Sequence, residues 1–239
     1  LYDEPHFLLQ QEVSEVGSYF SIIKAIAAGN HKLSAIAAVL EVKSTNLTKY
    51  LKTLMDLDIL ERRVPVTEEN PEKSKRGLYK IKDNYLRFWF AFIYPNMSFI
   101  ESGHSGIVMD KIRRGLTTSH IGFVYEDICQ ERMWELNVNN AWPFQFSQLG
   151  GYWDAKNEID IAALDPEGKN LILGECKYWK EPVGLNVLHA LEAKAGDVAW
   201  ERDRRKVWYV LFSISGFSDE LRNHAATRDD LLLIDDGER

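Results

Sequence analysis

Two short apolar segments with charged residues at fixed positions constrain the fold of this 239-residue chain more than any other feature. Residues 158–164 (EIDIAAL) and 171–178 (LILGECKY) have the length of buried strands, and the turn formers DPEGKN connect them. A hairpin centred on this loop pairs Leu164 with Leu171. The same register places Asp160 opposite Glu175, with Cβ atoms about 4.5–5.5 Å apart.

Lys177 is two residues from Glu175, so both side chains point to the same face of their strand, and Cys176 points to the other. Two opposed carboxylates destabilise an apolar sheet unless a cation lies between them. An alternative is a solvent-facing strand edge with paired charges, but the neighbouring residues are strongly apolar. We therefore predict that Asp160, Glu175 and Lys177 form a catalytic site.

The two carboxylates indicate a divalent cation, because Mg²⁺ prefers hard oxygen ligands and takes one or two carboxylates. We expect Mg²⁺ or Mn²⁺ on Asp160 and Glu175, with the main-chain carbonyl of Cys176 as a further ligand. Such an ion would activate a water molecule and stabilise charge on a phosphate. Lys177 would orient that water and offset negative charge in the transition state.

The first 104 residues have the pattern of a winged helix-turn-helix. Apolar spacing predicts helices at 13–28, 34–40 and from Ser44 onward, followed by strands at 59–66 and 77–81. In such a domain the third helix enters the major groove and the wing contacts phosphate. A plain helical bundle and a protein-contact module remain alternatives. The predicted DNA-binding residues are Lys43, Lys49, Lys52, Lys73, Lys75 and Arg76.

The rest of the chain alternates helices and strands, which predicts an α+β or α/β fold with domains at 1–104 and 105–239. An aromatic helix at 83–94, broken at Pro95, is expected to be core, and residues 102–106 to be a linker. The further elements are helices at 107–114, 119–136, 184–198 and 217–228 and strands at 144–149, 158–164, 171–178, 206–214 and 231–234. From the helix at 184–198, we expect Asn186, His189 and Lys194 within reach of the site or of a substrate phosphate, although a surface or core-edge position is favoured for His189.

These residues and this order support a family resemblance. Residues 158–161 (EIDI) followed by 175–179 (ECKYW) resemble the PD-(D/E)XK nuclease signature, and the order is similar to the αβββαβ core of these restriction-endonuclease-like proteins. Many members use an acid of the first helix as an additional metal ligand. Glu126 occupies that place, so the resemblance implies that Glu126 is a ligand.

The whole chain is also similar to the C-terminal half of the archaeal DEXX-box ATPase family, through residues 78–90 (LYKIKDNYLRFWF) and 174–177 (GECK). In that family a P-loop ATPase domain precedes a winged helix and a nuclease-like domain. These 239 residues contain no GxxxxGK[ST] sequence, so ATP is expected only in an upstream domain. The chain also begins without Met, and we expect it to be part of a longer protein.

Composition and charge limit the partners and the cellular setting that we expect for the chain. The formal net charge is −7, yet residues 43–82 hold 10 basic and 6 acidic side chains, which is compatible with local DNA binding. Two cysteines without zinc-ligand spacing indicate a reducing, cytoplasmic setting. The longest apolar stretch, residues 88–94, is too short for a membrane span, and the first residues lack the pattern of a signal peptide.

Three functions are compatible with the sequence. The first is a metal-dependent DNA endonuclease, or phosphodiesterase, that binds DNA through the winged domain. The second is a catalytically inactive nuclease-like module that tethers an ATPase to DNA or to a partner protein. The third, a transcription regulator, makes poor use of the carboxylate pair. DNA is the expected partner, and self-association is compatible with all three.

Overall fold

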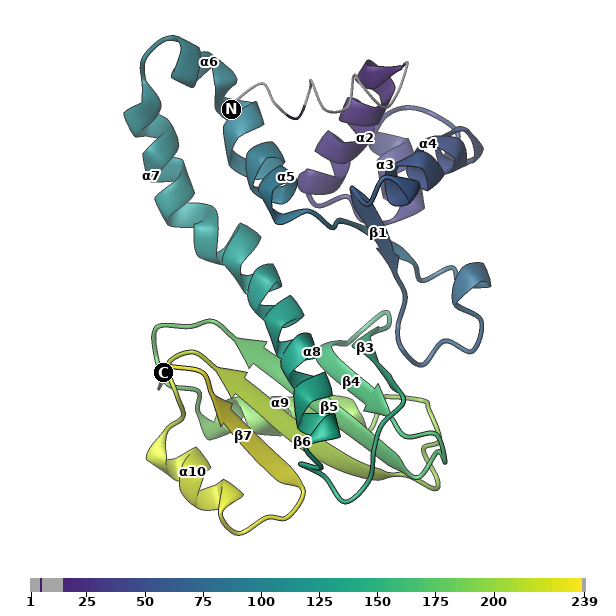
Figure 1. The fold of residues 1–239 in the computed structure, drawn as a ribbon, viewed down its shortest axis with the longest axis vertical. Helices are drawn as coiled ribbons and strands as arrows, with labels where there is room; N and C mark the ends of the chain where they lie inside the picture. The colour runs from purple at the N-terminus through teal and green to yellow at the C-terminus, as the bar shows by residue number, and fades with distance from the viewer. Residues whose placement is uncertain (1–4, 6–14, 238–239) are drawn as a thin grey trace. The chain divides into compact units, whose positions relative to one another are not determined.

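The computed structural model describes residue 5 and residues 15–237, which form two compact units (Figure 1). Unit 1 comprises Leu1–Arg63 and Glu72–His120, and unit 2 comprises Val64–Pro71 and Ile121–Arg239. Each unit has its own hydrophobic core. The predicted α+β fold class is confirmed, with helices followed by a mixed sheet.

In the described part of unit 1, from residue 15 onward, three helices precede a two-stranded antiparallel ribbon, in the predicted order. Its elements are α2 (Val16–Ala27), α3 (Leu33–Val39), α4 (Ser44–Asp56), β1 (Leu60–Arg63), η1 (Pro71–Lys73), β2 (Leu78–Ile81), α5 (Asn84–Phe88), η2 (Trp89–Ile93), η3 (Tyr94–Asn96), α6 (Met97–Glu101) and α7 (Ser105–Leu116). Leu47, Leu51 and Leu54 form the buried stripe of α4. The predicted start of the first helix, at residue 13, lies outside the described residues.

The first strand of the ribbon ends at Arg63, three residues earlier than predicted. β1 pairs with β2 from Leu60 opposite Ile81 to Arg63 opposite Leu78. Pro65 has no N–H to donate to a ladder, and the N–H of Val66 donates instead to the carbonyl of Gly151 at 3.0 Å. Residues 64–71 consequently belong to unit 2.

The aromatic segment is core, as predicted, but Pro95 does not break its helical path. Asp83 caps α5 by accepting a hydrogen bond from the N–H of Leu86 at 2.7 Å. The path then continues through the π-helical η2 and the 3-10 turn η3, and Pro95 lies at the start of η3, where its missing N–H is tolerated. Trp89, Phe90 and Phe92 are buried in unit 1.

The division between the units falls later than the predicted boundary after residue 104. The expected linker is a short turn between α6 and α7, and α7 packs against η2 inside unit 1. The chain passes into unit 2 through the π-helical turn η4 (Thr117–Ile121), which leads into α8 (Gly122–Val138). The 102–106 signal of Ser and Gly therefore marks a turn within unit 1.

Unit 2 is a five-stranded mixed sheet between helices. Its strands and later helices are β3 (Gln148–Trp153), β4 (Glu158–Leu164), β5 (Asn170–Lys177), α9 (Leu185–Ala195), β6 (Lys206–Ser213), α10 (Asp219–Ala225) and β7 (Leu231–Asp235). The strands lie in sequence order; β3, β4 and β5 are antiparallel, and β6 and β7 continue in parallel. From α8 to β6 this is the predicted αβββαβ order.

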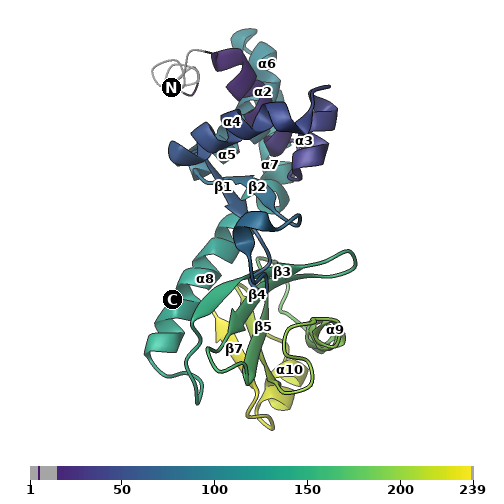
Figure 2. The same cartoon turned by 90° about the vertical axis from the view of Figure 1, so that its right-hand side faces the viewer.

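Helices lie on both sides of the sheet, with α8 on one side and α9 and α10 on the other (Figure 2), and side chains of the central strands pack against each layer. Ile161, Ala163 and Ile172 pack with Cys129 and Met133 of α8. The residues that alternate with them, Ala162, Leu164, Leu171 and Leu173, pack in the core under α9 and α10, to which Ile159 also belongs. Because both faces are covered, the charged residues within these strands lie at a buried or half-buried site.

The first strand of the sheet is not at 144–149, as predicted, but at Gln148–Trp153. The side chain of Asn137 on α8 satisfies both main-chain groups of Phe146: its Oδ1 accepts from the Phe146 N–H, and its Nδ2 donates to the Phe146 carbonyl, each at 3.0 Å. Phe146 is thereby held beneath α8 instead of entering the ladder. The strand begins two residues later and has a bulge between Gly150 and Tyr152.

Among the described residues, no helix combines the length and the apolar character that a membrane crossing requires.

Candidate active site at the end of a central hairpin

The β4–β5 hairpin has the predicted register. Leu164 lies opposite Leu171 and Ile161 opposite Gly174. The ladder ends there, one pair before Asp160 and Glu175, and the side chain of Asp160 takes over the pairing: its Oδ2 accepts a hydrogen bond from the N–H of Cys176 at 2.8 Å. The two strands separate at this point, and their charged side chains converge in the space between them.

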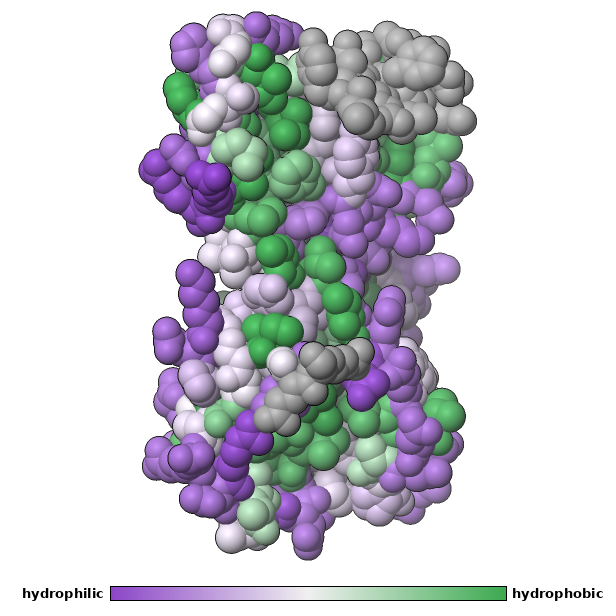
Figure 3. All heavy atoms as spheres, turned by 60° about the vertical axis from the view of Figure 1, so that its left-hand side comes forward, coloured by the Kyte–Doolittle hydropathy of each residue, from purple (hydrophilic) through white to green (hydrophobic). Residues whose placement is uncertain are grey.

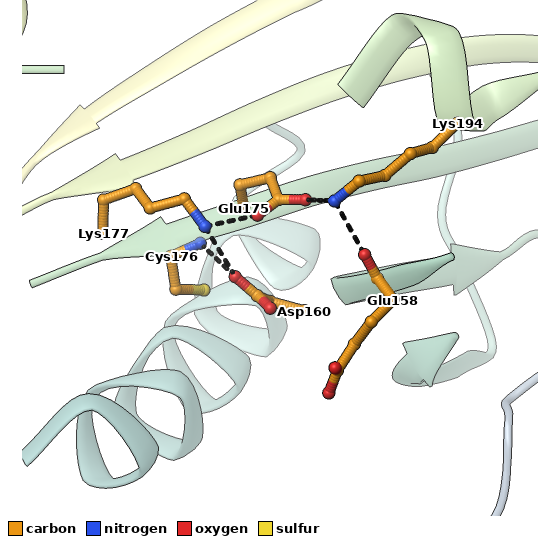
Figure 4. A network of polar contacts seen from close by, with 6 residues as sticks. All are labelled: Glu158, Asp160, Glu175, Cys176, Lys177 and Lys194. Carbon is orange, nitrogen blue, oxygen red and sulfur yellow. Dashed lines mark hydrogen bonds and ion pairs between the residues drawn. The ribbon is translucent and has the colours of Figure 1, made fainter. Parts of the chain in front are cut away.

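Asp160, Glu175 and Lys177 form one contact network (Figure 4). The Nζ of Lys177 donates to Glu175 Oε2 and lies 3.4 Å from Asp160 Oδ2. Glu175 is only 5% exposed, and the Asp160 side chain is 16% exposed. The structure therefore brings together all three residues that the sequence predicts to be catalytic, with one ammonium between two carboxylates.

A fourth side chain, Lys194 of α9, completes the network. Its Nζ donates to Glu175 Oε1 at 2.7 Å and to the main-chain carbonyl of Glu158 at 2.8 Å. Lys194 thereby ties α9 to both strands of the hairpin. The other two suggested helix residues, Asn186 and His189, are exposed and make no hydrogen bond to the trio among the described residues. The carbonyl of Glu158 was missed, because no sequence signal marks a main-chain acceptor.

The two carboxylates differ in electrostatic environment. Burial, together with the charge of Glu175, raises the pKa of Asp160 above its ordinary value, and Lys177 only partly opposes this. Burial also acts to raise the pKa of Glu175, but Lys177 and Lys194 outweigh it, so this pKa is lowered. Asp160 is therefore the member of the pair that takes up a proton more readily.

Lys177 stays charged in this setting. Burial lowers its pKa, but the adjacent Asp160 and Glu175 have the larger combined effect and raise it above its ordinary value. The site consequently holds a fixed positive charge next to two acids. A fixed ammonium of this kind can stabilise negative charge on a group bound next to it.

Glu126 lies on α8, and its charge acts on the thiol of Cys176. Cys176 packs under α8, and burial, Cys129, Asp160 and Glu126 together raise the pKa of its thiol well above the ordinary value. Within the described part of the chain, no three His, Cys, Asp or Glu residues gather in a group suited to hold a metal ion. The structure thus unites Asp160 and Glu175 but does not bring Glu126 into a three-acid cluster.

The donor set nevertheless suits a hard divalent cation. Lys177 Nζ touches both carboxylates, so a positive charge is already accommodated between them. Magnesium sites in proteins often use one or two carboxylates and leave the other positions to water and phosphate. Asp160 and Glu175 would hold such an ion, and the main-chain carbonyl of Cys176, between Glu175 and Lys177 in the chain, is the next donor along β5.

The predicted DNA-binding residues of unit 1 are solvent-accessible. Lys43 immediately precedes α4, and Lys49 and Lys52 lie on its outer surface. Lys52 forms an ion pair with Asp56 at 2.9 Å, with both side chains largely exposed. The loop residues of the ribbon are Lys73 and Lys75, which are exposed, and Arg76, which is half-buried.

Comparison with known proteins gives a family match without an activity. Residues 89–194 match the family DUF234, described as archaeal and bacterial proteins of unknown function. An uncharacterized protein of Methanocaldococcus jannaschii is 40% identical over 178 residues, which is 74% of this chain. The chain spans 39% of the length of that relative.

Among solved structures, a repair endonuclease from Pyrococcus abyssi aligns over 43% of this chain and 44% of its own, with 12% identity. The TM-score is 0.29, and no shared fold is inferred at this value.

Proposed function

We propose that the chain is a metal-dependent DNA endonuclease of the PD-(D/E)XK type. The observation that supports it is the convergence of Asp160, Glu175 and Lys177 at the point where two central strands separate. Placing two acids close together beneath helices costs stability, and a structural core gains nothing from it. A site that must hold a cation and a phosphate explains this cost.

Each residue has a role that follows from its contacts. Asp160 and Glu175 would bind Mg²⁺ or Mn²⁺, which would supply an activated water molecule and offset charge on the scissile phosphate. Lys177 presents its ammonium to the phosphate. Lys194 acts through Glu175: it holds one carboxylate oxygen and is itself anchored on the Glu158 carbonyl, so it is a positioning residue. Glu126 stays a proposed further ligand.

The first test is cleavage of plasmid, linear and branched DNA with Mg²⁺ or Mn²⁺. Asp160→Ala and Lys177→Ala are expected to lower cleavage at least about 100-fold, as expected when a group that stabilises transition-state charge is removed. Lys169→Ala is the matched control, because Lys169 lies at the other end of the same hairpin and pairs with exposed Glu167. Cleavage that persists in both site variants would rule out this site.

Unit 1 is proposed to be the DNA-binding domain, a winged helix-turn-helix. The support is the order of α2, α3, α4 and the β1–β2 ribbon, with exposed lysines on α4. The double variant Lys49→Glu/Lys52→Glu is expected to weaken duplex binding in a gel shift, whereas Lys24→Glu on α2 is the control. Equal affinity of the wild type and the double variant would exclude α4 from the contact.

A second candidate is an inactive nuclease-like module that tethers an ATPase. It is favoured by the two lysines that neutralise Glu175, since an ion pair can persist after cation binding is lost. In either case we propose that the chain is the C-terminal part of a longer cytoplasmic ATPase protein, in which ATP binds an upstream domain. Absence of cleavage by the wild type under all conditions would favour this candidate.

A further inference from the structure

One large aromatic side chain stands directly beside the charged site. Trp179 follows the last residues of β5 and is 46% exposed. The Nζ of Lys177 lies 5.8 Å from the centre of its ring. Other large apolar side chains are also exposed, and the face drawn in Figure 3 shows apolar areas among hydrophilic ones. Exposure alone therefore does not distinguish Trp179, but its contact with Lys177 does.

The backbone of Trp179 is held in place by hydrogen bonds, while the residue as a whole is 46% exposed. Ser215 Oγ donates to the Trp179 carbonyl at 2.5 Å, and the N–H of Ile214 donates to the carbonyl of Lys177 at 3.3 Å. Both partners follow β6, so the end of β5 is tied to the neighbouring strand. Because the backbone at Trp179 is already ordered, a flat ligand that stacks on the side chain need not order this segment of the chain.

The residues around Trp179 offer contacts to a nucleic-acid strand. Lys177 and Lys180 flank Tyr178 and Trp179, and Lys180 is exposed and makes no ion pair with any residue that the structure describes. Glu181 follows, and the whole chain carries a formal charge of −7. Electrostatic attraction to phosphates is therefore modest here, and a strand bound at this site needs a second source of affinity.

We propose that Trp179 is a stacking platform for an unpaired base next to the phosphate at Lys177. The substrate class is then single-stranded or branched DNA, because a base inside a continuous duplex has no free face to offer. Stacking on an aromatic side chain is tolerant of sequence and is a main source of affinity for single strands. This inference rests on the proposed nuclease function and specifies its substrate.

The test is binding of labelled DNA to the full chain in EDTA, measured by fluorescence anisotropy. Trp179→Ala is expected to weaken binding of a single strand and of a flapped duplex about 10-fold or more, as loss of one stacked base predicts. Binding of a blunt duplex should change little. Trp179→Phe keeps a ring and should keep most of the affinity. Trp134→Ala is the matched control, since Trp134 lies on α8 and is 44% exposed.

The outcomes separate this inference from the nuclease function. Equal single-strand binding by wild type and Trp179→Ala, or equal losses for single strand and blunt duplex, would overturn the stacking role even if the wild type cleaves DNA. A selective loss without any cleavage would support the stacking role and reject the nuclease. Circular dichroism checks that Trp179→Ala folds, and Trp179→Phe repeats the test with a smaller change.

Discussion

At the residue scale, two lysines compensate the negative charge of the two acids at the site. Lys177 contacts both Asp160 and Glu175, and Lys194 contacts only Glu175. This asymmetry explains why the pKa of Asp160 is raised and that of Glu175 lowered. Removing Lys177 would leave Asp160 without an ammonium partner and in contact with another buried negative charge.

We expect Lys177→Met to lower the free energy of unfolding at neutral pH by on the order of 3 kcal/mol, because it leaves an uncompensated buried charge. Adding Asp160→Asn should recover much of the loss. The measurement is urea unfolding in EDTA, with Lys169→Met as the control on an exposed ion pair, where little or no change is expected. Equal effects of Lys177→Met and Lys169→Met on the free energy of unfolding would contradict the role of Lys177 as the partner that compensates the buried charge of Asp160.

At the scale of elements, the helices behind the sheet are fastened by ion pairs away from the site. Arg228, after α10, donates to Asp230 before β7 at 2.8 Å and to Glu192 of α9 at 2.5 Å. The hydrogen bonds from Arg228 hold the pKa of Asp230 below its ordinary value. One side chain thus connects α9, α10 and the start of the last strand.

This lowered pKa gives unit 2 a defined pH dependence. Ionised Asp230 contributes stability above its unfolded pKa, about 3.9, and this contribution is lost as pH falls through the lower folded pKa. Asp230→Asn should therefore be less stable by about 1 kcal/mol near neutral pH, and the difference should vanish in acid. Unfolding measured across pH tests this, beside Asp229→Asn, which alters an exposed neighbour. If the stability difference between the wild type and Asp230→Asn does not change with pH, the pKa of Asp230 is not lowered by folding.

At the scale of the whole molecule, the two units do not coincide with two continuous stretches of sequence. Residues 64–71 leave the β1–β2 ribbon and join unit 2, where Val66 packs against the core beneath α9 and donates a main-chain hydrogen bond to Gly151. A chain cut at a single boundary would remove this segment from unit 2.

Val66→Ala is accordingly expected to destabilise unit 2 by about 1 kcal/mol, because it removes methyl groups from a partly buried position. Hydrogen exchange followed by mass spectrometry would locate the effect in β3 and β4. Val42→Ala, at an exposed position of unit 1, is the control. If the faster exchange appears in the ribbon strands instead, residues 64–71 do not belong to unit 2.

Much of the fold could be predicted from periodicity and turn residues, because these local signals act within one element. The helices of unit 1, the α+β class and the β4–β5 register follow from them. The errors arose where long-range contacts decided the structure: the side chain of Asn137 displaced the start of β3, Val66 left its predicted strand, and the Ser–Gly turn after α6 was not a boundary.

The sequence by itself determined that Asp160, Glu175 and Lys177 meet, since the hairpin register fixes positions on both strands through local geometry. Only the tertiary structure decided what surrounds them. Of the three candidate residues on the crossover helix, Lys194 is the one that contacts the trio. Glu126 on α8 acts on the Cys176 thiol, and the loop after β6 holds the main chain of Trp179. The physical reason is that successive side chains of a strand point to opposite faces, so the sequence tells which face each residue is on. Which helices and loops pack on that face depends on how the chain folds over the whole sheet.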